Sequence, residues 1–489
     1  MREHGTSDGV LFYLSLLDNE IEERFLRFLS ATGHGKAPSL AHLELTDAVI
    51  RTGPNGDLTV LRGGACTFPL YWSGRSKVRI ATHLPITSGA FSRAGLAATL
   101  ASVCLQSAYE PNAVTTTPIH GWRRIRRGAT TRFNAGGLVT ELPYLHHVEG
   151  EEDPERIAAR IRTAFEAYAH AQRHVAASVV ELSGGFDSTL AVAMIPAQRN
   201  SMLGASVEYP YYEFRFEAAV QQAVGSALNV ARTVFDGTAE FPYTPPHTAP
   251  RFDEPKIFVT GMRHAERMAR YAREHGAGRL YMGHGGDQLF CTDLLGTEAV
   301  SAMPERSPFA ASAWRALRSA HRTIHASAWL QRSTACFVYD ACQDVWAKET
   351  YGLDVRTPFT DLAVFRAALQ WSHWCATRSA KPDKTILTAA MGDVLPQAVT
   401  ERKGKVAYDG VWMRGYAHNA EHMASTIQGA AELLEHIGLS ATWLVRRIRQ
   451  LADRKAVSAR EVMGAYALST WLSSWGIQHP TDVEWVTEE

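Results

Sequence analysis

The sequence predicts an α/β protein of two domains, and three observations support that prediction. The chain has 489 residues, which is long for a single domain. From Ala177 onward, short apolar runs alternate with helix-like stretches, a pattern typical of βαβ units and a parallel sheet. Residues 147–154 are acidic and polar and form the best candidate for a linker. We therefore expect a first domain over residues 1–150 and a second domain over residues 151–489.

The first domain is expected to contain short strands, turns and a few helices. Apolar and β-branched runs predict strands at residues 10–14, 58–61 and 130–133, and Gly, Pro and Asn predict a tight turn at 53–57. Residues 93–106 have the pattern of a helix, with Ser92 as its N-cap.

The second domain is expected to be built on a parallel, doubly wound sheet. Its strands are predicted at residues 177–182, 202–207, 230–235 and 279–282, and its helices at 154–172, 189–195, 217–227 and 262–274. From about residue 307 the chain is expected to be mostly helical. Because ligands of such sheets bind at the carboxyl ends of the strands, the site should lie at that edge.

Charge and cysteine content exclude several classes of protein. Lys plus Arg and Asp plus Glu both number 50, so no global charge attracts nucleic acid or an acidic membrane. The six cysteines include no Cys-x-x-Cys pair, which argues against a disulfide framework or a structural zinc site. The N-terminus lacks the apolar core of a signal peptide, and no run approaches the roughly 18 apolar residues of a membrane span. We expect a cytoplasmic protein without nucleic-acid or membrane partners.

A glycine turn after the strand at 177–182 predicts a phosphate site. Two adjacent glycines, Gly184 and Gly185, permit positive φ and a close approach of the backbone to a ligand. Backbone N–H groups of the turn and of the following helix would then favour an anion. Ser183 and Ser188 add hydroxyl donors, and Asp187 is suited to hold Mg²⁺ against phosphate oxygens.

A second glycine turn follows the strand at 279–282 and also carries a carboxylate, Asp287. Two such turns at one edge of a sheet suggest a single Mg·ATP held between Asp187 and Asp287. No Lys follows the glycines of the first turn, which excludes the usual P-loop.

These motifs resemble known families. The first turn is similar to the pyrophosphate loop of the N-type ATP pyrophosphatases. The chain as a whole resembles the asparagine synthetase class B superfamily, through Tyr339 and Asp340 and through residues 64–72, 352–361 and 384–408. The resemblance implies an ATP pyrophosphatase-type second domain, with ATP and Mg²⁺ as cofactors. It also implies a first domain with the α/β sandwich of the glutamine amidotransferases (Ntn type).

The departures from the family pattern narrow the expected reaction. Glutamine-hydrolysing members carry a nucleophilic Cys directly after the initiator Met, where this chain has Arg2, so the first domain should lack the glutaminase. Members without this Cys, the β-lactam synthetases and the lasso peptide macrolactam synthetases, use an amine of the substrate. The position before the second Gly-x-Asp is Glu in asparagine synthetases and Tyr in β-lactam synthetases. Here it is His284, which is similar to the lasso cyclases, and Gln288 replaces a family Glu.

The resemblance also assigns roles to individual residues. It makes His284 a general base supported by Asp340, because a base of pKa near 6.5 can take the proton of an attacking amine. It makes Lys405 the electrophilic stabiliser, with Lys403 as an alternative. Four residues match positions that line adenine: Leu182, Val207, Met282 and Gly283. Glu213 aligns loosely with an acidic residue of the family.

The expected reaction is the ATP-dependent closure of a peptide macrolactam. An Asp or Glu side chain of a leaderless precursor peptide would be adenylated and then joined to the peptide's N-terminal amine, with release of pyrophosphate and AMP. The resemblance further implies a leader peptidase and a leader-recognition protein as partners. Two alternatives stay open: a β-lactam-type amide synthetase acting on a small amino acid, and a non-catalytic nucleotide-binding scaffold.

Overall fold

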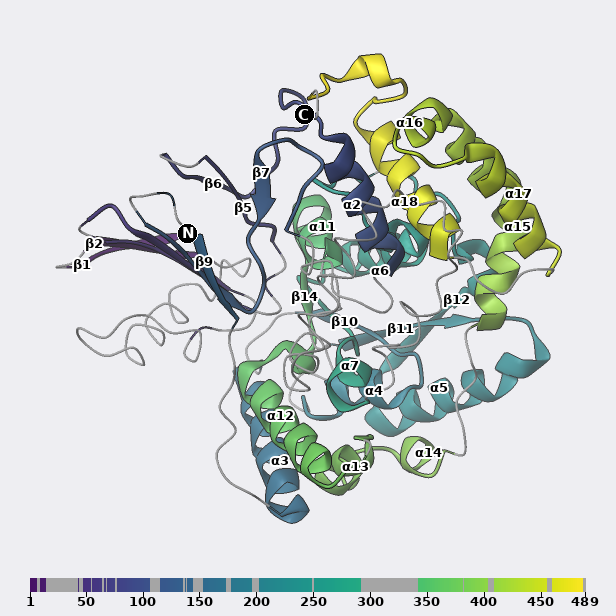
Figure 1. The fold of residues 1–489 in the computed structure, drawn as a ribbon. Coiled ribbons are helices and arrows are strands. Elements are labelled where there is room, and N and C mark those ends of the chain that lie inside the picture. Colours follow the sequence, from purple (N-terminus) through teal and green to yellow (C-terminus); the bar gives the residue numbers. More distant parts are fainter. Residues whose placement is uncertain are drawn as a thin grey trace.

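The fold is described from a computed structural model of the chain (Figure 1). It describes residues 1–6, 9–14, 43, 47–53, 55–63, 66, 68–74, 77–105, 115–134, 137, 139–143, 153–172, 177–195, 202–248, 250–291, 342–380, 382–402, 409–454 and 460–486. The predicted linker at 147–154 lies almost wholly outside these residues, so the domain boundary stays a prediction.

The N-terminal part forms two antiparallel sheets. The larger sheet has the order β1 (Arg2–Thr6), β2 (Gly9–Leu14), β3 (Ala48–Thr52), β4 (Leu58–Arg62), β8 (Ala129–Phe133) and β9 (Val139–Pro143). The smaller sheet has the order β6 (Arg79–Ala81), β5 (Tyr71–Ser73) and β7 (Trp122–Arg124). The three predicted strands are confirmed as β2, β4 and β8, and the predicted turn is closed by a hydrogen bond from Gly53 N to Asp57 O of 2.7 Å.

The predicted N-terminal helix is confirmed as α2 (Arg93–Leu105), and Ser92 Oγ accepts a hydrogen bond of 3.0 Å from Gly95 N as its N-cap. This helix packs against α18 (Arg460–Ser474) near the end of the chain (Figure 1). The described residues therefore show a mixed α/β protein. They do not establish the Ntn-type sandwich, which stays a prediction.

The parallel, doubly wound sheet is confirmed. Its order is β12 (Ala231–Asp236), β11 (Met202–Glu208), β10 (Ser178–Glu181), β13 (Arg279–Tyr281) and β14 (Asp354–Arg356), and every neighbouring pair is parallel. Strand β14 was not expected. It is three residues long and lies inside the stretch that the resemblance treated only as a motif, so it gave too short a signal for a strand prediction.

Helices cover both faces of this sheet. One face packs against α3 (Pro154–Ala171), α4 (Phe186–Ala193), α5 (Arg215–Leu228), α12 (Leu362–Thr377) and α13 (Thr385–Met391). The other face packs against α6 (Met262–Glu274) and α11 (Cys342–Tyr351). The expected helical tail is present as α14 (Gln397–Thr400), α15 (Asp409–Gly429), α16 (Ala431–His436), α17 (Ala441–Ala452) and α18.

Local signals explain where α3 begins and which face it buries. Asp153 accepts a hydrogen bond of 2.8 Å from Arg156 N, and Pro154 occupies the first turn, where its missing N–H costs nothing. The predicted apolar residues Ile157, Ile161 and Phe165 are all buried in the core under the sheet. Sequence periodicity therefore gave the correct face of this helix.

A buried ion pair fixes the small antiparallel sheet to the parallel-sheet part of the chain. Glu254, in the loop before α6, pairs with Arg124 of β7 and accepts a hydrogen bond of 3.0 Å from the Tyr71 hydroxyl of β5. Burial opposes ionisation of Glu254, but Arg124, Lys256 and the Tyr71 hydroxyl together outweigh burial and lower the pKa of the carboxyl. The loop that leads into α6 is thus held to two strands of the small sheet, β5 and β7.

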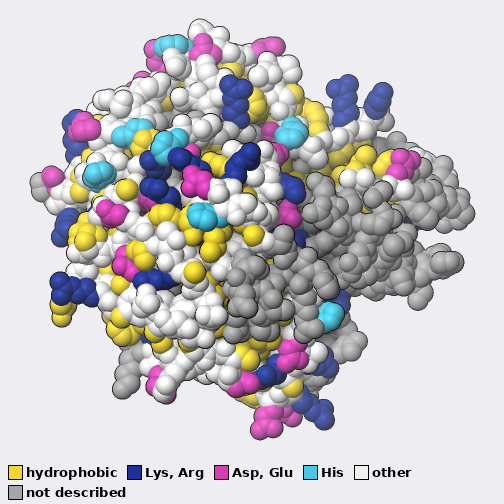
Figure 2. All heavy atoms as spheres, turned by 180° about the vertical axis from the view of Figure 1, so that it is seen from behind, with side chains coloured by type: hydrophobic (Ala, Val, Ile, Leu, Met, Phe, Trp, Pro, Cys, Tyr) yellow, Lys and Arg dark blue, Asp and Glu magenta, His cyan; other side chains and the backbone are white. Residues whose placement is uncertain are grey.

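Charged side chains of both signs are interspersed over the face seen in Figure 2, in keeping with the balanced composition. Within the described part of the chain, no helix is both long and apolar enough to cross a membrane.

Candidate active site

The first glycine turn links β10 to α4 at the carboxyl edge of the parallel sheet. Gly184 has a φ of +73°, a conformation that only glycine adopts readily. The hydroxyls of Ser183 and Ser188 lie 2.8 Å apart, and Ser188 also donates to Gly185 O at 3.2 Å. Helix α4 begins at Phe186, three residues earlier than predicted, because Gly185 is extended and serves as the N-cap. Asp187 therefore lies in the first turn of the helix.

The second glycine turn links β13 to α7 (Gly286–Phe290) and packs directly on the first. A Cβ atom at Gly283 would collide with the backbone of Asp187 and Ser188, so only glycine permits this approach. Thr357, which follows β14, donates a hydrogen bond of 2.6 Å to the carbonyl of His284. The turn is thereby fixed from two neighbouring strands.

The two predicted carboxylates come together through a lysine that the sequence analysis did not assign to the site. Lys384, directly before α13, lies 2.6 Å from Asp187 Oδ2 and also pairs with Asp287 Oδ1. Burial opposes the charge on Lys384, but the two carboxylates outweigh burial and raise the pKa of the ammonium. The available signal was its position in the closing motif at residues 384–408.

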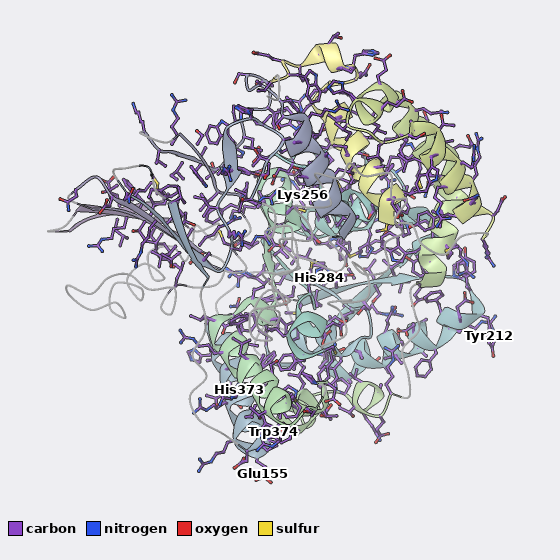
Figure 3. All side chains as sticks on the ribbon, in the orientation of Figure 1. Glu155, Tyr212, Lys256, His284, His373 and Trp374 are labelled. Carbon is purple, nitrogen blue, oxygen red and sulfur yellow. The ribbon has the colours of Figure 1, made fainter. Side chains whose placement is uncertain are left out.

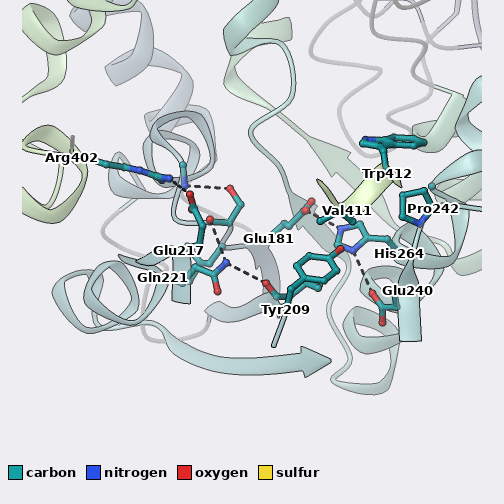
Figure 4. Close-up of a pocket in the computed structure, with 15 residues that line it drawn as sticks. Glu181, Tyr209, Glu217, Gln221, Glu240, Pro242, His264, Arg402, Val411 and Trp412 are labelled. Carbon is teal, nitrogen blue, oxygen red and sulfur yellow. Dashed lines mark hydrogen bonds and ion pairs between the residues drawn. The ribbon is translucent and has the colours of Figure 1, made fainter. Parts of the chain in front are cut away.

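A pocket of about 340 Å³ opens beside the first turn (Figure 4). Of the predicted nucleotide residues, Leu182, Ser183, Gly185 and Val207 line it. Its other lining residues are Glu181, Tyr209, Glu217, Gln221, Glu240, Pro242, Gly261, His264, Arg402, Val411 and Trp412.

Two of the predicted adenine residues do not line this pocket. The Met282 side chain is buried in the core against α6, and its sulfur accepts a hydrogen bond of 3.1 Å from Gln343 Nε2. Gly283 is part of the contact between the two turns. Of the four, only Leu182 and Val207 line the pocket.

The model of the asparagine synthase family matches residues 157–350 and 347–473, which together span more than half of the chain. The chain belongs to the asparagine synthase family. The match covers the parallel sheet, both glycine turns and most of the helical tail. A search of curated protein sequences returned no match.

Enzymes of this family use ATP with Mg²⁺ and form amide bonds, so this chain is an ATP-dependent amide-forming ligase by family. The described residues contain no group of three or more His, Cys, Asp or Glu side chains that could hold a metal alone. Mg²⁺ usually needs only one or two carboxylates when phosphate oxygens and water complete its shell. The pair Asp187 and Asp287 fits that requirement, and Lys384 supplies the positive charge between them in this structure.

A charged wall closes the pocket on the side of α6, and the sequence analysis did not predict it. His264 Nε2 lies 2.9 Å from Glu181 Oε1, and His264 Nδ1 lies 3.4 Å from Glu240 Oε2. Arg267 Nε donates a hydrogen bond of 2.7 Å to Glu240 Oε1. Burial disfavours the imidazolium, but the two carboxylates outweigh burial and raise the pKa of His264 to about 10. The wall combines segments that are far apart in the chain, so no local sequence motif could predict it.

His284 lies near the middle of the molecule at the end of the parallel sheet (Figure 3). Its side chain is accessible to solvent, yet enough protein surrounds the ring for desolvation to lower its pKa. Glu181 opposes that shift, and His264 adds to it. The imidazole is therefore neutral at lower pH than a free histidine. Asp340, its predicted partner, lies outside the described residues.

The closing motif at residues 384–408 contacts the first turn through Arg402. Its guanidinium donates a hydrogen bond of 3.0 Å to Gly184 O and pairs with buried Glu217. Lys403, the next residue, and Lys405, two residues further on, lie outside the described residues, so the role of Lys405 stays a prediction. In the sequence, Arg402 is marked only by its position in the motif at residues 384–408.

Glu213 is exposed and pairs with Arg414 of α15 at 2.7 Å. Arg414 in turn lies 3.8 Å from the centre of the Tyr211 ring. These contacts join the segment after β11 to the helical tail and give Glu213 a local partner outside the pocket.

Proposed function

We propose that this protein is an ATP-dependent peptide macrolactam synthetase of the lasso cyclase type. It adenylates an Asp or Glu side chain of a leaderless precursor peptide and joins the carbonyl carbon to the peptide's N-terminal amine. The products are an isopeptide-bonded ring, AMP and pyrophosphate.

The observation that carries the proposal is the position of His284 at the same edge of the sheet as the paired carboxylates Asp187 and Asp287. All three follow strands of one parallel sheet, at the edge where ligands of such sheets bind. A phosphate-binding turn and a neutral base at one edge suit a reaction in which a carboxylate is first activated and then attacked by an amine.

In the first step, a carboxylate oxygen of the peptide attacks the α-phosphorus of ATP, and pyrophosphate leaves. Backbone N–H groups of the first turn and the hydroxyls of Ser183 and Ser188 orient the phosphates. Asp187 and Asp287 would hold Mg²⁺, which neutralises the pyrophosphate as it departs. With Mg²⁺ on these carboxylates, the ammonium of Lys384 would instead meet phosphate oxygens.

In the second step, the N-terminal amine attacks the acyl carbon, and AMP leaves. An α-amino group has a pKa of about 8, so part of it is already neutral near pH 7. His284 accepts the remaining proton at the imidazole, a contribution of about 10²–10⁴ in rate for a general base. Asp340 is proposed to orient the imidazolium, and Lys405 to stabilise the oxyanion.

The state of Cys66 supports an amine from the substrate over ammonia from glutamine. Cys66 is the first cysteine in the sequence, and it is fully buried in the core of the N-terminal part. Burial raises the pKa of its thiol, although Arg62 opposes the shift. A thiol held protonated in a core is a poor nucleophile.

The leader peptidase and the leader-recognition protein are proposed as partners because they would supply the free N-terminus.

The proposal is tested by pyrophosphate release from Mg·ATP. Three substrates are offered separately: free aspartate with ammonia, a small β-amino acid, and synthetic peptides with a free N-terminus and an internal Asp or Glu at varied spacing. Turnover only with a peptide, and a product lighter by one water, are expected. An N-acetylated copy of the same peptide should release pyrophosphate without closing a ring.

Other outcomes separate the alternatives. Turnover with the small amino acid would identify a β-lactam-type synthetase. Nucleotide binding without pyrophosphate release from any substrate, repeated in the presence of the partner proteins, would identify a scaffold.

A further inference from the structure

The charged wall of the pocket lies opposite the phosphate-binding turn. Figure 4 shows Arg402, Glu217 and Gln221 at one side of the pocket and His264, Glu240 and Trp412 at the other. Glu181 lies between these sides. Three separate elements build the wall: the end of β10, helix α6 and the short 3-10 helix at Gly237–Glu240.

The wall carries two carboxylates and two cations. His264 Nε2 forms a hydrogen bond of 2.9 Å with Glu181 Oε1, and Nδ1 lies at the ion-pair distance of 3.4 Å from Glu240 Oε2. The ring lies between two carboxylates, and this position favours the imidazolium. Arg267 pairs with the second oxygen of Glu240. Because these four charges cancel, the wall has no net charge and gives no special attraction to a cationic ligand.

A ligand in the pocket can reach only part of this wall. The Glu240 side chain is 0% exposed, whereas the side chains of Glu181 and His264 are 22% and 31% exposed. Both ring nitrogens of His264 face carboxylates, one in a hydrogen bond with Glu181 and one at ion-pair distance from Glu240, so the ring serves to hold the wall together. The group that the wall offers is the Glu181 carboxylate, a hydrogen-bond acceptor whose position His264 fixes.

The position of the pocket indicates which part of a nucleotide meets this acceptor. With the phosphates on the turn at Ser183 and Gly185, the apolar residues Leu182 and Val207 border the space beyond it. A nucleoside attached to those phosphates would occupy that space. Its neutral donors are the ribose hydroxyls and the exocyclic amine of the base, and either can donate to a carboxylate.

We propose that Glu181, held in place by His264, determines nucleotide specificity by accepting a hydrogen bond from a neutral donor of the nucleoside. The proposal rests on the ATP-dependent function proposed above. His264, Glu240 and Arg267 act as positioning residues, because they orient Glu181 and do not touch the ligand with a free donor.

The test is a titration calorimetry series without peptide, so that no nucleotide is consumed. Mg·ATP, Mg·2′-dATP, Mg·3′-dATP and Mg·ITP are titrated into the full chain. Wild type should bind ATP about 10- to 100-fold tighter than the analogue that lacks the relevant donor, the usual effect of a hydrogen bond to a charged group. A deoxy analogue identifies a ribose hydroxyl as the donor, and ITP identifies the base amine.

The decisive variant is Glu181→Ala, with Glu181→Gln as a second variant that keeps a neutral acceptor and the shape of the side chain. Glu181→Ala should bind ATP and that analogue equally, and Glu181→Gln should show an intermediate preference. The matched control is Glu208→Gln, which alters a carboxylate at the end of the adjacent strand that pairs with Arg232 at 2.8 Å. The control should keep the wild-type preference.

Two results would overturn the inference while leaving the proposed function intact. One is a wild-type protein that binds all four nucleotides equally. The other is a Glu181→Ala variant that weakens all of them by one common factor, which is what a purely structural role predicts. A wild-type protein that binds none of the nucleotides would overturn both the inference and the proposed function.

Discussion

Two pairs of carboxylates with a cation between them lie at the carboxyl edge of the parallel sheet, and they differ in how firmly the cation is held. Lys384 joins Asp187 and Asp287 through one ammonium on a flexible stem. His264 joins Glu181 and Glu240 through a planar ring that is held at both nitrogens, with Arg267 behind Glu240. The first arrangement suits an exchange of the cation for a metal ion. The second suits a rigid wall.

The largest effect should follow the loss of a carboxylate from the pair Asp187 and Asp287. Asp187→Asn removes one of two carboxylates that can hold Mg²⁺, so pyrophosphate release should fall by about 10³-fold or more. Asp393→Asn, at an exposed carboxylate 2.8 Å from Arg162, is the matched control and should keep full activity. Activity of Asp187→Asn within tenfold of wild type would remove this pair from the metal site.

The next effect concerns His284, which the charges of the wall influence. His284→Ala should slow ring closure by about 10²-fold or more while the exchange of labelled pyrophosphate into ATP continues. Because the pKa of His284 is lowered from 6.5, the imidazole becomes protonated only at a pH below that value. The rate of ring closure should therefore begin to fall on the acid side only below pH 6.5. His373→Ala, on α12 away from the sheet edge, is the control (Figure 3). Equal loss of exchange and closure would contradict the assignment of a base.

A smaller effect should show whether Mg²⁺ replaces the ammonium of Lys384 between the two carboxylates or whether the lysine stays paired with them. Lys384→Met removes the cation that competes with Mg²⁺, so Mg²⁺ alone should raise the melting temperature of this variant more than that of wild type. The expected extra rise is about 2–4 °C, the shift that about 1 kcal/mol produces in a domain of moderate size. Lys348→Met, at a lysine that pairs with Asp354 at 2.8 Å, should show no extra rise. An identical response of Lys384→Met and wild type would argue against competition.

A further effect, on stability alone, is the pH dependence that His264 provides. Its pKa is about 10 in the folded protein and about 6.5 when unfolded. This stabilisation is therefore fully present below pH 6.5 and is lost as pH rises through 10. Melting temperature should fall more steeply between pH 7.5 and 10 for wild type than for His264→Gln. Parallel curves for the two proteins would show that His264 is not a buried cation.

The two pairs also differ in how far the sequence alone could predict them. Asp187 and Asp287 each follow a glycine turn at the end of a strand, and each turn is a local pattern, so their approach could be anticipated. Lys384 lies almost 100 residues beyond Asp287 in a motif without an obvious chemical role. The wall combines a strand residue with an α-helix and a short 3-10 helix. Nothing near Glu181 in the sequence marks this residue as more than the end of a strand.

The same reasoning explains the outcome for the fold. Periodicity and turn residues act locally, so the parallel sheet, α3 and α6 were predicted close to their observed bounds. The packing of α2 against α18 and the short strand β14 depend on contacts between distant segments. The predicted roles of Asp340 and Lys405 concern residues outside the described part of the chain and stay predictions.

The measurement that tests the central claim most directly follows an oxygen atom. A peptide substrate is labelled with ¹⁸O in its internal Asp or Glu carboxylate and incubated with the enzyme and Mg·ATP, and AMP and the cyclic product are weighed. Activation as an acyl-adenylate predicts one ¹⁸O in AMP and the other in the new amide. Unlabelled AMP, or ADP with label in phosphate, would contradict adenylation of the carboxylate.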